Sequence, residues 1–161
     1  MNLFALGLNH NTAPLALREK VAFSSEELDT ANQKIRAMLG NPAGGGIKEV
    51  AILSTCNRTE IYCAAEDSEL ASKKLKEFLA ESKGVKFNEL EEHLYVFLND
   101  DAARHARENA DEKNKDLIRR VHSPPPSFEQ LRAEVLPAVT NAGNIARRSK
   151  CPARLGKARN L

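Results

Sequence analysis

Long apolar stretches are missing from this sequence of 161 residues. A helix that spans a bilayer needs ~20 consecutive apolar residues, and no run in the chain approaches that length. The N-terminus, from Met1 to Leu6, also lacks the basic flank and the longer apolar segment of a signal peptide. We therefore expect a soluble, cytoplasmic protein that has no membrane partner.

Cysteine is scarce and irregularly spaced. The odd number of cysteines, Cys56, Cys63 and Cys151, argues against a disulfide scaffold and for a reducing compartment. A metal centre built from Cys56, Cys63, His93 and His105 would have neither C-x-x-C nor H-x-x-x-H spacing. The sequence therefore predicts no metal site.

A recognisable dinucleotide-binding loop is also absent. The glycines at 44–46 precede an expected strand instead of following one, and they lack G-x-G-x-x-G spacing before a helix. We interpret them as a hinge. The chain contains no internal repeat.

Acidic and basic residues are divided unevenly along the chain. Residues 1–106 contain 12 Lys and Arg against 16 Asp and Glu, whereas residues 107–161 contain 12 against 6. The second part begins with a highly polar stretch, continues through Pro124-Pro125-Pro126, and has helical patterning only from Phe128 to Leu136. We predict a domain at 1–108 and a basic tail at 109–161 that is weakly structured, partly helical or disordered.

Apolar patterning in the first part predicts alternating strands and helices. Strands are expected at 3–8, 50–53, 59–65 and 94–98, and helices at 14–23, 25–39, 71–82 and 102–108. The strand at 50–53 has the apolar run of a central strand buried on both faces, and its link to 59–65 is too short for a parallel crossover. The expected fold is α+β, with a single mixed or antiparallel sheet of about four strands covered by helices.

The turn after the strand at 50–53 contains a candidate nucleophile, Cys56. A cysteine reacts as its thiolate, and an ordinary pKa of about 8.5 leaves little thiolate at neutral pH, so a reactive cysteine needs a positively biased site. Arg58 supplies that charge and suits bidentate binding of a substrate carboxylate, while Thr55 and Asn57 offer donors to an oxyanion. The alternative is inert packing, which is the commoner fate of a cysteine after an apolar strand.

Two further residues are candidates for opposite roles. His105, on the last predicted helix, is a candidate general acid or base, although a lone surface histidine usually has no such role. Cys63 lies within an alternating strand, so we predict that it belongs to the core.

Three runs of sequence resemble the N-terminal domain of glutamyl-tRNA reductases. They are Gly7-Leu8-Asn9-His10-Asn11-Thr12-Ala13-Pro14, Leu17-Arg18-Glu19-Lys20 and Leu53-Ser54-Thr55-Cys56-Asn57-Arg58-Thr59-Glu60-Ile61-Tyr62. The resemblance covers residues 1–106. It implies that Cys56 attacks the ester of glutamyl-tRNA and forms a thioester, which NADPH reduces to glutamate-1-semialdehyde for tetrapyrrole (porphyrin) biosynthesis.

The same resemblance implies roles for other residues and for partners. Thr55, Asn57 and Arg58 would contact the glutamyl group, and His105 of the run Asp100-Asp101-Ala102-Ala103-Arg104-His105 would be important for activity. Family members are homodimers, and a glutamate-1-semialdehyde aminotransferase is an expected partner beside glutamyl-tRNA.

The resemblance ends soon after His105. The family continues with a Ser-Gly-Leu-Asp-Ser segment, a Gly-Glu-Pro-Gln segment, an NADPH-binding domain and a dimerisation domain, whereas this chain continues with Arg107-Glu108-Asn109-Ala110-Asp111-Glu112. We therefore expect the reduction half of the reaction to be missing here, which leaves thioester formation or an esterase half-reaction.

Three alternatives stay open at this point. One is a non-catalytic tRNA- or RNA-binding module that uses the six basic residues after Val135. A second is a Cys-His hydrolase of another family. The third is that the tail is out-of-frame sequence without a function.

Overall fold

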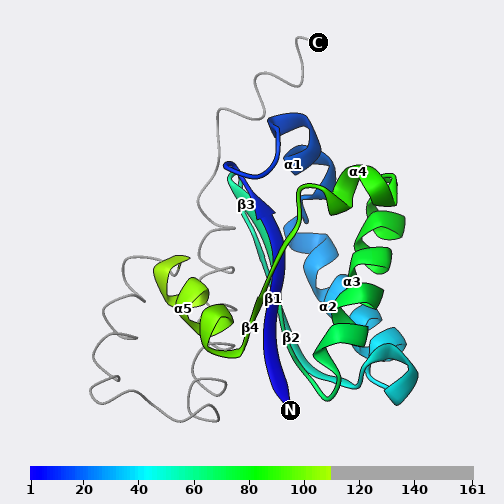
Figure 1. Ribbon diagram of the computed structural model, residues 1–161. Helices are drawn as coiled ribbons and strands as arrows, with labels where there is room; N and C mark the ends of the chain where they lie inside the picture. Colours follow the sequence, from blue (N-terminus) through cyan, green and yellow to red (C-terminus); the bar gives the residue numbers. More distant parts are fainter. Residues whose placement is uncertain (110–161) are drawn as a thin grey trace.

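The computed structural model describes residues 1–109 (Figure 1). The basic tail, and with it the RNA-binding alternative and the predicted boundary at residue 108, depends on residues outside that part. Among residues 1–109, no helix is long and apolar enough to cross a membrane. The elements are β1 (Asn2–Asn9), α1 (Leu15–Val21), α2 (Ser25–Leu39), η1 (Pro42–Gly44), β2 (Ile47–Ser54), β3 (Arg58–Ala65), α3 (Ser68–Lys83), α4 (Phe87–Glu91), β4 (Tyr95–Leu98) and α5 (Asn99–Asn109).

The four strands form one antiparallel sheet in the order β2-β3-β1-β4. β1 pairs with β3 on one side and β4 on the other, while β2 pairs only with β3. β3 therefore separates β1 from β2, and β1 separates β3 from β4, as in a split βαβ arrangement. The α+β prediction with one sheet of about four strands is confirmed, and the pairing is antiparallel.

The predicted central position of residues 50–53 is wrong. They belong to β2, which is longer than expected and lies at the edge of the sheet. Its apolar run has another cause: α2 packs on one face, and Ala51 and Leu53 are buried on the other. Burial on both faces says nothing about how many strands lie alongside.

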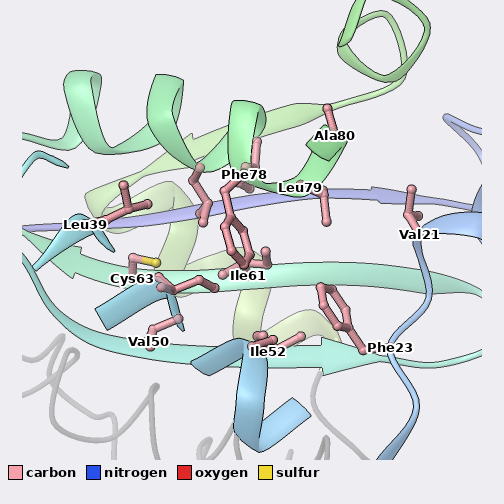
Figure 2. Close-up of a cluster of buried hydrophobic side chains, with 14 of the residues drawn as sticks. Val21, Phe23, Leu39, Val50, Ile52, Ile61, Cys63, Phe78, Leu79 and Ala80 are labelled. Carbon is pink, nitrogen blue, oxygen red and sulfur yellow. The ribbon is translucent and has the colours of Figure 1, made fainter. Parts of the chain in front are cut away.

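Helices α1 to α4 cover one face of the sheet, and α5 lies against the other (Figure 1). The larger core lies between the sheet and the first group of helices, and Figure 2 shows Ile52 and Ile61 of the sheet together with Phe78 and Leu79 of α3 in this cluster. Cys63 belongs to the same core, as predicted.

Local signals fix two helix ends. Ser24 Oγ accepts a hydrogen bond from the backbone N–H of Glu27, and the Glu27 carboxylate accepts one from the N–H of Ser24, which makes the capping box before α2. Gly84 ends α3 with φ of +62°, a conformation that glycine adopts without strain.

The α5 face is the side of the sheet that matters for the site. Asn99, the first residue of α5, directly follows β4 and adopts φ of +48°, a left-handed conformation in which asparagine is enriched. Three small buried side chains, Ala102, Ala103 and Ala106, line the contact of α5 with the sheet. This contact places His105 beside β4.

Candidate active site

Cys56 lies in the short connection between β2 and β3, at the rim of the sheet. The N–H of Thr55 donates to the carbonyl oxygen of Arg58 at 2.8 Å, and the N–H of Asn57 donates to Thr55 Oγ1 at 3.2 Å. Thr55, Cys56 and Arg58 are half-buried and Asn57 is exposed. The structure thus places four of the five predicted site residues in one turn.

The backbone of this turn is held from outside the hairpin. Arg18 of α1 donates from Nη1 to the carbonyl oxygen of Cys56 at 3.0 Å. One residue before the turn, the buried hydroxyl of Ser54 accepts a hydrogen bond from the N–H of Phe23 at 2.9 Å. The chain around α1 therefore fixes the position of the candidate nucleophile.

Behind the turn, Glu60 is a fully buried carboxylate on the α5 face of β3. Its Oε1 accepts hydrogen bonds from Arg58 Nη1 at 3.2 Å, from the Tyr95 hydroxyl at 2.5 Å and from His105 Nε2 at 2.7 Å. Its Oε2 accepts one from the Tyr62 hydroxyl at 2.7 Å. We call these five residues the Glu60 cluster. It joins β3, β4 and α5 around one negative charge.

The electrostatics of the cluster keep this carboxylate ionised. Burial acts to raise the pKa of Glu60, but hydrogen bonds from His105, Tyr95 and Tyr62 and the charge of His105 outweigh it, so that the pKa lies below its usual value. Burial, followed by the charge of Glu60, raises the pKa of Tyr62 and of Tyr95. Both tyrosines therefore stay protonated as donors.

His105 is the fifth predicted site residue, and its ring is nearly enclosed. The side chain is 14% exposed, lies 4.5 Å from the Phe97 ring and 5.3 Å from the Tyr95 ring between centroids, and contacts Glu60. His105 and Arg58 thus meet on a single carboxylate oxygen, although 47 positions separate them in sequence.

Sequence reasoning missed Glu60, Tyr62, Tyr95 and the role of Arg18 in this site. One signal was present for Glu60: it is a charged residue inside a strand whose other members are mostly apolar. A buried carboxylate in such a strand requires partners. Their identity depends on strand pairing and on α5, which the sequence pattern does not give.

A model of the family "Glutamyl-tRNAGlu reductase, N-terminal domain" matches residues 6–110. This chain belongs to that family. Glutamyl-tRNA reductases from Saccharophagus degradans and Polaromonas naphthalenivorans are 49% identical to this chain over 105 residues and 44% identical over 106 residues, respectively. These matches cover 65% and 66% of this chain but only 23% of each relative, so the chain spans about a quarter of their length.

One solved structure is similar to the glutamyl-tRNA reductase domain in its chain trace. It is the glutamyl-tRNA reductase from Methanopyrus kandleri, with a TM-score of 0.48 and 21% sequence identity. The alignment covers 91% of this chain and 34% of that one.

The glycine run before β2 is not built as a dinucleotide-binding loop, which would follow a strand. The glycines at 44–46 belong to the 3-10 turn and its continuation into β2, and a Cβ at Gly45 would lie 2.5 Å from the backbone nitrogen of Ala71. Gly45 therefore packs against the first turn of α3, whose N-cap residue Asp67 donates from its backbone N–H to the carbonyl oxygen of Gly45. Within residues 1–109, no three His, Cys, Asp or Glu side chains lie together in a way that would hold a metal ion.

Proposed function

We propose that residues 1–109 form the acyl-transfer part of a glutamyl-tRNA reductase, in which Cys56 accepts glutamate from glutamyl-tRNA as a thioester. The observation that carries the proposal is the placement of Cys56 in a turn whose backbone Arg18 anchors and which Arg58 closes. A nucleophile must be held at a fixed position relative to the bond it attacks, because misplacement by about 1 Å costs up to ~100-fold in rate. Membership of the family supplies the substrate.

The proposed reaction is transfer of the glutamyl group from the tRNA ester to the thiolate of Cys56. The sulfur of Cys56 attacks the ester carbonyl carbon, the bond from that carbon to the terminal ribose oxygen breaks, and the ribose oxygen leaves as a hydroxyl after taking a proton. His105 serves as the acid or base that moves this proton. The products are the glutamyl thioester and free tRNA.

Three neighbours serve the substrate in this proposal. Thr55 and Asn57 donate hydrogen bonds to the oxygen that becomes negative during the attack. The hydroxyl of Thr55 accepts from Asn57 within the turn and still has its own proton to give. Arg58 binds the side-chain carboxylate of glutamate, for which a guanidinium is better suited than an ammonium.

The thioester has two fates. In the family it is reduced by NADPH to glutamate-1-semialdehyde, but the glycines at 44–46 form a packed turn before β2 and not a dinucleotide-binding loop, and we assign residues 1–109 no part of the reduction. Without a hydride the thioester is lost to water, and the chain acts as an esterase on glutamyl-tRNA. The aminotransferase partner, the homodimer and the cytoplasmic location stay predictions.

The test is transfer of radiolabelled glutamate from glutamyl-tRNA to the purified 161-residue protein, stopped in acid. We expect label on the wild type and on Cys63→Ala, and none on Cys56→Ala. Free glutamate should then appear at a rate that depends on Cys56. Equal labelling of wild type and Cys56→Ala would overturn the proposal.

A further inference from the structure

Glu60 has no part in the chemistry proposed above, yet it is a charged side chain with 0% exposure. Burying a carboxylate is costly, and replacing a buried ionic group by well-packed apolar residues is often neutral or stabilising. Stability alone is therefore a weak reason for a glutamate at this position. Its contacts point to the neighbouring turn and to His105.

Oε1 of Glu60 contacts both residues with proposed roles on this face, through Nη1 of Arg58 and Nε2 of His105. An ionised carboxylate only accepts hydrogen bonds, so Nε2 of His105 must carry its hydrogen. In the neutral ring the basic nitrogen is then Nδ1. The same oxygen fixes one end of the Arg58 guanidinium and thereby the direction of its other N–H groups.

We propose that Glu60 is a positioning residue that sets the ring tautomer of His105 and orients Arg58 for the substrate carboxylate. The assignment of roles to Arg58 and His105 rests on the proposed function. The tautomer assignment does not rest on the proposed function, because it follows from the hydrogen bond between Nε2 of His105 and the ionised Glu60.

Gly7 supports this proposal independently. It faces Glu60 in the β1–β3 ladder, and a Cβ at Gly7 would lie 2.7 Å from Glu60 Cγ and 2.6 Å from the carbonyl oxygen of Thr59. Both distances are shorter than the contacts that Cβ atoms make in proteins, so position 7 has no room for a side chain. β1 therefore contributes no side chain at this position, and the space is filled by the stem of the glutamate.

The surroundings of the carboxylate are otherwise donors. Arg58 and Tyr62 come from β3, Tyr95 from β4 and His105 from α5, whereas the β1 residue opposite Glu60 is Gly7. The lowered pKa of Glu60 agrees with this set of donors, whose hydrogen bonds outweigh the effect of burial. The carboxylate therefore stays negative over the pH range in which a histidine moves protons.

The first experiment reads the tautomer by NMR of the whole chain labelled with nitrogen-15 at histidine, with His105→Asn to assign the His105 signals. We expect His105 to carry hydrogen on Nε2 in the wild type. In Glu60→Gln the Nε2–H proton should move upfield, because an amide oxygen is a weaker acceptor than a carboxylate. An Nδ1–H tautomer in the wild type, or an unchanged Nε2–H signal in Glu60→Gln, would overturn the proposal.

The second experiment measures single-turnover acyl transfer over a range of glutamyl-tRNA concentrations. Glu60→Gln should slow transfer at saturating substrate by ~10-fold and raise the half-saturating concentration, since both His105 and Arg58 lose a charge-assisted contact. Glu66→Gln is the matched control, because Glu66 follows the same strand with 56% of its side chain exposed. It should behave as the wild type.

A double-mutant cycle separates positioning from general weakening of the fold. If Glu60 acts through His105, Glu60→Gln should change the saturating rate little once His105 is already Asn, while it still raises the half-saturating concentration through Arg58. Fully additive losses of rate would contradict the proposal. If Glu60→Gln does not fold, the tautomer of His105 in the wild type still tests the proposal. That measurement is also independent of whether the chain transfers glutamate.

Discussion

Arg18 and Cys56 are joined by a hydrogen bond across 38 positions of sequence, from the guanidinium Nη1 to the backbone carbonyl oxygen at 3.0 Å. The acceptor is the main chain of Cys56. The bond ties α1 to the turn between β2 and β3. The candidate nucleophile thus owes its position to a residue on another element.

Arg18→Gln should slow acyl transfer to Cys56 without a large loss of stability. Removing one hydrogen bond from a charged donor costs about 1.5–3 kcal/mol, which corresponds to a loss of ~10-fold or more if it falls on the transition state. Lys20→Gln removes the same charge from the exposed side of the same helix and should transfer at the wild-type rate. Equal rates for both variants would show that α1 does not position the turn.

Glu60 should give the folded chain a pH dependence that Glu60→Gln lacks. Its pKa is lower in the folded chain than its ordinary value of 4.5, so ionisation favours folding. This contribution is complete above 4.5 and is lost as the pH falls through the folded-state pKa. Urea unfolding from neutral pH down to about pH 3 measures it.

The wild type should therefore lose stability on acidification more steeply than Glu60→Gln. A parallel decline of the two free energies of unfolding below 4.5 would contradict the hydrogen-bonded, ionised carboxylate. Glu66→Gln again serves as the control, because its exposed carboxylate has little influence on the difference between folded and unfolded states.

Gly7→Ala should be destabilising because it forces a methyl group against Glu60 and the β3 backbone. Overpacking of this kind costs about 1–3 kcal/mol, measured as a shift in the free energy of unfolding. The same substitution should slow acyl transfer by displacing Glu60. Normal stability together with normal transfer would show that the close approach of Gly7 to Glu60 is relaxed in solution.

The two described cysteines should differ in reactivity toward iodoacetamide. Cys56 is half-buried in its turn, whereas Cys63 has 0% exposure and burial raises the pKa of its thiol. In the native protein Cys56 should be alkylated and Cys63 should react only after unfolding. Peptide mapping distinguishes both from Cys151, and native alkylation of Cys63 would contradict the burial of β3.

Much of the framework could be predicted from local sequence signals. The capping box at Ser24 and Glu27, the end of α3 at Gly84 and the core position of Cys63 each depend on residues close in sequence or on alternation along one strand. The short link between β2 and β3 also fixed their antiparallel pairing, because a parallel crossover needs a dozen or more residues.

The lateral order of the strands and the Glu60 cluster could not be predicted in this way. The apolar run of β2 indicates that both faces of the strand are buried, but it carries no information about its position at the edge of the sheet. Glu60 contacts Tyr95 and His105 only because β1 pairs with both β3 and β4 and because α5 packs against β1 and β4. Those are long-range relationships, which single-sequence patterns do not encode.

The most direct test of the central claim identifies the residue that carries glutamate. The protein is mixed with glutamyl-tRNA, quenched in acid, digested and mapped by mass spectrometry. We predict a glutamyl group on the peptide that contains Cys56, released by hydroxylamine as expected for a thioester. Glutamylation of Cys63 or Cys151 instead, or no glutamylated peptide from active substrate, would contradict the assignment of Cys56 as the nucleophile.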